Sequence, residues 1–130
     1  MGEELEEEDA YNLTLMRALK VALHELGHMF GLMHCIYYEC NMNSYGDVLL
    51  TDTRPIYFCA VCYRKLSLVL QFDHLKRYKA LADVSAQFGG RFSEYEEWFG
   101  KRHDAMAEIL KDLKPPNAPK EEAKNSKKKK

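Results

Sequence analysis

The chain has 130 residues and a formal net charge of −1 at pH 7, which is enough sequence for one compact domain and too little for two. No apolar run approaches the roughly eighteen residues that a membrane span needs. The first residues are acidic, where a secretory signal would be basic and then apolar. We therefore expect an intracellular protein, cytoplasmic or nuclear, with no membrane partner.

Both ends of the chain are strongly charged and poor in apolar residues. The first ten residues contain six acids, and residues 114–130 contain seven lysines and two acids. We expect residues 1–10 to be a disordered acidic start and residues 114–130 to be a disordered lysine-rich tail. The run Lys127–Lys130 could attract nucleic acid, but a solubilising tail has the same composition, so we expect no nucleic-acid partner. This leaves residues 11–113 as the folded domain.

Residues 11–30 are predicted to form the first helix, because apolar residues recur there at steps of three and four. Gly31 follows directly, and glycine commonly ends a helix because it tolerates a positive φ. We therefore expect the chain to turn back at this position. The apolar stripe of the helix consists of Leu15, Leu19, Ala22, Leu26 and Met29.

The rest of the domain is predicted to be a long loop followed by two helices. Residues 35–62 are rich in Asn, Asp and other loop formers, and a loop of this length in a small domain needs an anchor. Residues 63–88 are predicted to be helical up to the break at Gly89 and Gly90, and residues 93–113 form a third helix. The fold class is therefore mainly α, with three helices and one anchored loop.

Three histidines and a glutamate form the first candidate site. His24 and His28 are four residues apart, so on a helix both rings project from one face and can reach a single zinc ion. His34, arriving after the turn, supplies a third ligand. Three protein ligands leave the fourth place of a tetrahedral zinc for water, and Glu25 can accept a proton from that water. This pattern is typical of a catalytic zinc site.

An alternative interpretation treats these residues as ordinary parts of a helix. His24 and His28 would then be polar residues on a solvated face, and Glu25 would be a helix-stabilising charge. This alternative does not account for Gly31 and His34, which complete the ligand pattern.

Four cysteines form the second candidate site. Four residues separate the first pair, two separate the second pair, and eighteen lie between the pairs. Two such short hooks joined by a loop are the usual arrangement of a four-thiolate zinc site, which would anchor residues 35–62. The alternatives are free thiols in a reducing compartment or small buried apolar residues. The cysteines are Cys35, Cys40, Cys59 and Cys62.

The segments that carry both sites resemble one known family. HELGHMFGLMHC, followed by the pattern C-IYYE-C-N-M and then by F-C-A-V-C, is similar to the archaemetzincins, zinc metalloproteases of the metzincin clan. The resemblance covers about residues 17–70. The stretch between Met42 and Cys59 is about one residue shorter than the family pattern, a difference that a loop absorbs.

The resemblance implies a role for each of these residues. It implies a catalytic zinc on His24, His28 and His34, with Glu25 as general base and Met42 as the Met-turn residue beneath the metal. The four cysteines would bind a structural zinc, so that the chain holds two zinc ions. Without the resemblance, Met42 would be interpreted as a core filler.

The resemblance also implies a fold and a function. Metzincins have an amino-terminal sheet subdomain that forms the upper wall of the substrate cleft, and only twenty-three residues precede His24. We therefore expect the carboxy-terminal part of a metzincin-like zinc-peptidase fold, without that sheet subdomain. The expected function is a zinc metallopeptidase that hydrolyses a peptide or protein substrate with a zinc-bound water and Glu25 as general base. The alternative is a non-catalytic zinc-binding module, derived from a truncated metalloprotease and acting through protein contacts. The sequence predicts no oligomeric state.

Overall fold

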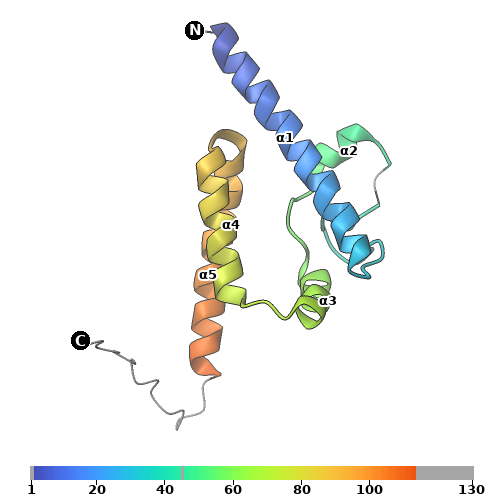
Figure 1. The fold of residues 1–130 in the computed structure, drawn as a ribbon, viewed down its shortest axis with the longest axis vertical. Coiled ribbons are helices and arrows are strands. Elements are labelled where there is room, and N and C mark those ends of the chain that lie inside the picture. Colours follow the sequence, from blue (N-terminus) through green and yellow to red (C-terminus); the bar gives the residue numbers. More distant parts are fainter. Residues whose placement is uncertain (1, 45, 114–130) are drawn as a thin grey trace, which may run out of the picture.

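The computed structural model describes residues 2–44 and 46–113 (Figure 1). The described part is helical and contains no strand, so the predicted mainly α class is confirmed. The predicted tail, residues 114–130, lies outside the described residues. The helices are α1 (Gly2–Met29), α2 (Val48–Thr53), α3 (Ala60–Leu70), α4 (His74–Phe88), the 3-10 helix η1 (Gly90–Phe92) and α5 (Ser93–Asp112).

The first helix, α1, is longer than the sequence predicted. It begins at Gly2, so residues 2–10 are helical where we expected a disordered acidic start. Two effects explain the difference: adding residues to an existing helix costs little, and acids near its amino terminus interact favourably with the helix dipole. Asp9 also pairs with Arg91 of η1, with 2.7 Å between Oδ1 and Nε.

The carboxy-terminal end of α1 has the hydrogen bonds of a Schellman motif. The backbone N–H of Gly31 donates to the carbonyl of His28 at 3.0 Å, and that of Leu32 donates to the carbonyl of Gly27 at 2.9 Å. Gly31 has a φ of 89°, which is the left-handed conformation predicted for it. The chain therefore reverses directly after the second histidine.

The segment predicted as one helix, residues 63–88, forms two. Helix α3 ends at Leu70, and Gln71 has a φ of 51°, which is incompatible with a continuing helix. Asp73 then caps α4, its Oδ1 accepting from the backbone N–H of Lys76 at 2.9 Å. Apolar residues continue at helical spacing across this break, so the periodicity did not indicate that Asp73 caps a new helix.

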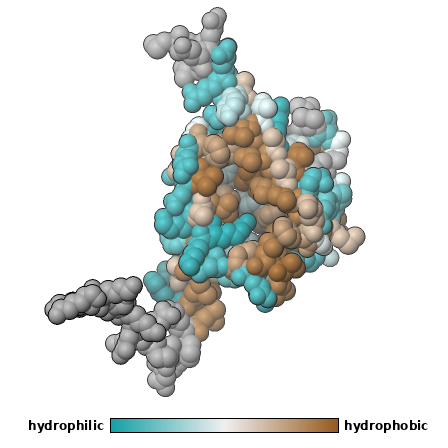
Figure 2. Space-filling view, in the orientation of Figure 1, coloured by the Kyte–Doolittle hydropathy of each residue, from teal (hydrophilic) through white to brown (hydrophobic). Residues whose placement is uncertain are grey.

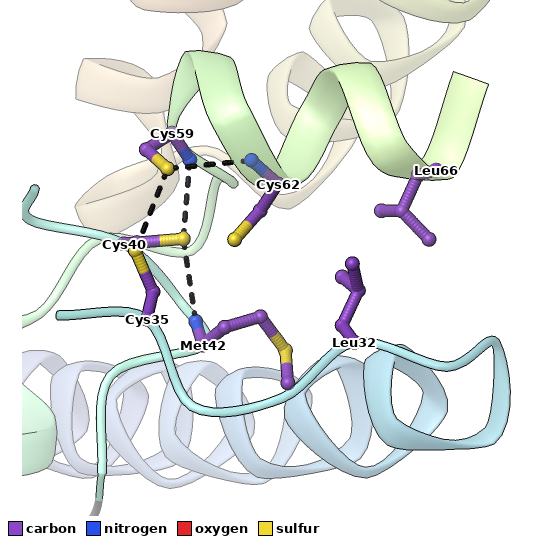
Figure 3. Close-up of a cluster of buried hydrophobic side chains, with 7 residues drawn as sticks. All are labelled: Leu32, Cys35, Cys40, Met42, Cys59, Cys62 and Leu66. Atoms are coloured by element: carbon purple, nitrogen blue, oxygen red, sulfur yellow. Dashed lines mark hydrogen bonds between the residues drawn. The ribbon is translucent and has the colours of Figure 1, made fainter. Parts of the chain in front are cut away.

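Two separate cores hold the domain together. One lies between the end of α1 and α3 and contains the four cysteines (Figure 3). The other lies among α1, η1 and the α4–α5 hairpin, where Met16, Tyr78, Phe92 and Phe99 are buried. No helix in the described part is long and apolar enough to cross a membrane. The described residues of the predicted loop, 35–44 and 46–62, are irregular apart from α2 and the start of α3.

Candidate metal centres

The three predicted histidine ligands lie together at the end of α1. The nitrogens that they can offer to an ion all lie within 4.8 Å of one another. The Nε2 atoms of His24 and His28 are 3.1 Å apart. The ring centroid of His34 lies 5.2 Å from that of His24 and 5.0 Å from that of His28. One ion can therefore reach a nitrogen of all three rings.

Backbone carbonyls orient two of these rings. Nδ1 of His24 lies 2.8 Å from the carbonyl oxygen of Asn41, and Nδ1 of His28 lies 2.7 Å from that of Leu32. A carbonyl can only accept, so each Nδ1 carries the hydrogen and each Nε2 keeps its lone pair for a metal. Burial lowers the pKa of His24, which favours the neutral ring that binds metals. The histidine set therefore fits a zinc ion.

Glu25 and His34 are exposed, whereas His24 is buried and His28 is partly buried. Glu25 follows His24 on α1. The carboxylate thus stands in solvent on the helix that carries two of the histidines. This position leaves the Glu25 carboxylate accessible to solvent.

The four predicted cysteine ligands are buried in one cluster, in which Cys40 comes from the loop and Cys59 and Cys62 from the start of α3 (Figure 3). The Sγ atoms all lie within 4.8 Å of one another, and those of Cys35 and Cys59 are 3.7 Å apart. A disulfide would require about 2.05 Å. Two thiolates at about 2.3 Å from one tetrahedral zinc are about 3.8 Å apart. The spacing therefore fits a metal site.

Backbone N–H groups point at these sulfurs. Sγ of Cys40 accepts from the N–H of Cys59 at 3.1 Å and from that of Met42 at 3.4 Å. Burial raises the pKa of Cys40 to about 11, and burial also raises the pKa of Cys62. Buried thiolates need a compensating cation, and a bound divalent metal deprotonates its thiol ligands. The donor set is thus that of a four-thiolate zinc site.

Met42 lies beside α1, fully buried, with its side chain against Gly27. A Cβ at Gly27 would overlap Sδ of Met42 and would lie 3.5 Å from Cδ1 of Leu32. The sequence pointed to Met42 and Gly31 but did not single out Gly27. In the sequence, only the position of Gly27 between His24 and His28 indicated a role at the site.

Replacing Gly27 with alanine should destabilise the protein by about 1–3 kcal/mol, because the new methyl group forces Met42 away from α1. Gly100 is the matched control: it also lies inside a helix, and nothing lies within 4 Å of a Cβ built there. Gly100→Ala should stabilise by about 0.5–1 kcal/mol through helix propensity alone. Urea denaturation followed by circular dichroism measures both. Equal effects of the two substitutions would contradict the close packing of Met42.

Asn41 is a residue of the site that the sequence pattern did not reveal. It is fully buried, and its backbone N–H donates to the carbonyl of Tyr57 at 2.9 Å. Its side-chain Nδ2 donates to the carbonyl of Lys20 at 3.1 Å, one turn before His24 on α1. The side chain thus holds in place the carbonyl that orients His24. In the sequence, only the position of Asn41 between Cys40 and Met42 indicated a role at the site.

Asn41→Ala should weaken metal binding at the histidines by about 10–100-fold, the usual effect of losing an outer partner of a metal ligand. The cysteine cluster should keep its metal, since the sulfurs do not depend on this side chain. Competition titration against a chromogenic chelator measures the two affinities. An unchanged histidine-site affinity would show that the Asn41 side chain does not position the carbonyl.

Comparison with known proteins decides the family. Residues 3–68, slightly over half of the chain, match the model of Peptidase family M54. The chain belongs to this family. The family predicted from the sequence, the archaemetzincins, is thereby confirmed.

The similarity to individual archaemetzincins covers about half of this chain or less. Archaemetzincin-2 of Pongo abelii is 40% identical over 70 residues, which cover 54% of this chain and 19% of that protein. Archaemetzincin-2 of Homo sapiens is 39% identical over the same length. Archaemetzincin of Pyrococcus abyssi is 48% identical over 50 residues, 38% of this chain and 27% of the relative. The chain thus matches about a fifth of the length of archaemetzincin-2, and no solved structure matches it.

Proposed function

We propose that this chain is a zinc-dependent metallopeptidase unit that hydrolyses peptide bonds. Membership of a peptidase family and the name archaemetzincin support a zinc metallopeptidase at the family level. The observation that carries the proposal is the orientation of His24 and His28. Their Nδ1 atoms face backbone carbonyls, so the two Nε2 atoms, 3.1 Å apart, are left for one metal.

In this proposal His24, His28 and His34 hold the catalytic zinc, and Glu25 acts as the general base. A zinc ion on three protein ligands lowers the pKa of water toward 7 and polarises a carbonyl. Glu25, which is exposed on α1, accepts the proton of the attacking water and then donates it to the leaving amine. The metzincin-like arrangement of the site, with Met42 packed beneath the histidines, is part of the same proposal.

A second zinc on the four cysteines would have a structural role. The cluster joins the segment after the third histidine to the start of α3 (Figure 3). Cys40, whose sulfur lies in this cluster, directly precedes Asn41, whose carbonyl orients His24. The cysteine zinc would therefore support the catalytic site by holding this short segment in place.

The alternative is a zinc-binding module that does not catalyse hydrolysis. One observation favours it: the match covers about a fifth of archaemetzincin-2, so most of that relative's sequence lies outside the matched region. Catalysis depends on holding the substrate in register as well as on an activated water. Such a module would keep both metals and show no turnover.

A peptide-library digest distinguishes the two functions. We expect the zinc-loaded chain to cleave peptides, to lose this activity when a chelator removes the metal, and to regain it when zinc is returned. Mass spectrometry of the products gives the cleaved bonds. The absence of cleavage by a folded chain with two zinc ions would refute the enzyme and support the module.

A further inference from the structure

An apolar groove runs between α1 and α4 and is lined by none of the proposed metal ligands. Figure 2 shows a hollow in a hydrophobic face of the molecule, where Figure 1 shows the space between these two helices. The cavity in it has a volume of about 300 Å³. Leu19 and Leu23 of α1 form one wall, residues 56–58 line it between the helices, and Leu81 and Phe88 of α4 lie opposite.

A second cavity of about 150 Å³ continues the groove toward the end of α1. Leu26 and Phe30 line it, and it shares Leu23, Phe58 and Arg77 with the first. On a helix that rises 1.5 Å per residue, the eleven steps from position 19 to 30 span roughly 16 Å. That length accommodates about five residues of extended polypeptide.

Within residues 2–44 and 46–113, Arg77 is the only charged side chain that lines these two cavities. Its Cζ lies 5.1 Å from the ring centroid of Phe72, 5.3 Å from that of Tyr63 and 5.9 Å from that of Tyr78. Among the described residues, no carboxylate forms a salt bridge with it. Arg77 is partly buried, and the three rings offset part of the cost of desolvating its guanidinium, which stays charged. The groove therefore offers an occupant one positive charge and no negative charge.

The exposure of the groove indicates the kind of molecule that binds there. Small ligands are usually enclosed, with about 70–90% of their surface buried. Here five of the apolar side chains that line the groove remain 41% to 47% exposed, so the groove is an open surface that suits a polypeptide lying along it with one side in solvent. These residues are Leu26, Phe30, Leu70, Val84 and Phe88.

We propose that this groove binds a polypeptide segment whose apolar side chains fill it and whose single Asp or Glu side chain pairs with Arg77. No proposed metal ligand lines the groove, although Gly27, which packs against Met42, lines its second cavity. The proposal does not depend on peptidase activity. A guanidinium–carboxylate pair formed in such apolar surroundings is strong and sets the register of the segment.

Selection from a phage-displayed library of random decapeptides on the intact, zinc-loaded chain tests this proposal. We expect enriched peptides to be apolar with one acidic residue. Changing that acidic residue to its amide should weaken binding of the peptide to the parent chain about tenfold. The same change should weaken its binding to Arg77→Gln less than about twofold, because this variant has no positive charge for the acid to pair with. Arg64→Gln is the matched control: Arg64 is exposed on α3 and lines neither cavity, so this variant should bind like the parent.

A second variant covers the case in which Arg77→Gln does not fold. Leu81→Glu places a carboxylate one turn from Arg77 on α4 and should abolish peptide binding. Three results would overturn the proposal: no enriched peptide, enriched peptides whose acidic residue has no effect on affinity, or full binding to Leu81→Glu. Dodecanoate that binds more tightly than the peptides and displaces them would also overturn it, because the groove would then be a lipid site.

Discussion

Glu25→Gln should abolish peptide hydrolysis while both zinc ions remain bound. The amide keeps the size of the side chain but cannot accept a proton from water, and loss of a general base lowers the rate by about 10²–10⁴-fold. Because the proposed zinc ligands are His24, His28 and His34 and do not include Glu25, the affinity of this site for zinc should not change. Steady-state cleavage of a peptide substrate, with zinc measured by elemental analysis on the same sample, checks both parts.

Glu39→Gln is the matched control, because Glu39 is also exposed and lies near the site in sequence, yet has no role in the proposed mechanism. It should retain the parental rate. If the Glu25 variant hydrolyses peptides as fast as the parent, Glu25 is not the base. If it loses zinc, the loss of activity reflects metal binding and the proton-transfer role is unsupported.

Cys59→Ser should reduce the zinc content from two ions per chain to one and destabilise the domain. Structural zinc contributes on the order of 10 kcal/mol to folding of small zinc domains. Cys59 has three roles in the cluster: its Sγ lies 3.7 Å from that of Cys35, its N–H donates to Cys40, and it caps α3 by accepting from the N–H of Cys62. Elemental analysis and thermal denaturation measure the two effects.

Ser67→Ala provides the control, since Ser67 is buried on the same helix and contributes no sulfur. It should keep both metals. A Cys59 variant that still holds two zinc ions would show that the cysteines are not metal ligands. A parent that holds one zinc, lost in the variant, would leave the histidines without metal and favour the non-catalytic module.

The sequence allowed prediction of the ligand sets because each is defined by short spacings. Two histidines four residues apart must share a face once the segment is helical, and two pairs of cysteines form two short hooks. The structure brings both sets together, with ligand atoms within 4.8 Å in each. The Gly31 turn was also predictable, since a positive φ at a helix end is a local property of glycine.

Other features depend on contacts that spacing does not encode. The break between α3 and α4 at Gln71 was hidden, because apolar residues continue at helical steps through it. The extension of α1 to Gly2 was missed because the acidic composition argued for disorder, whereas the existing helix and the Asp9–Arg91 pair favour order. At the break, the apolar pattern hid a local helix cap at Asp73, and at the start of α1 the acidic pattern competed with a distant contact.

The sequence by itself therefore determined which side chains can bind metal and where the first helix ends, because both follow from local geometry. Only the tertiary structure decided how the rings are oriented and what supports them. The groups that do so are the carbonyls of Asn41 and Leu32 and the close approach of Met42 to Gly27. Every residue has a carbonyl, and a glycine inside a helix has many possible causes. Their roles become visible only when the loop is folded back against α1.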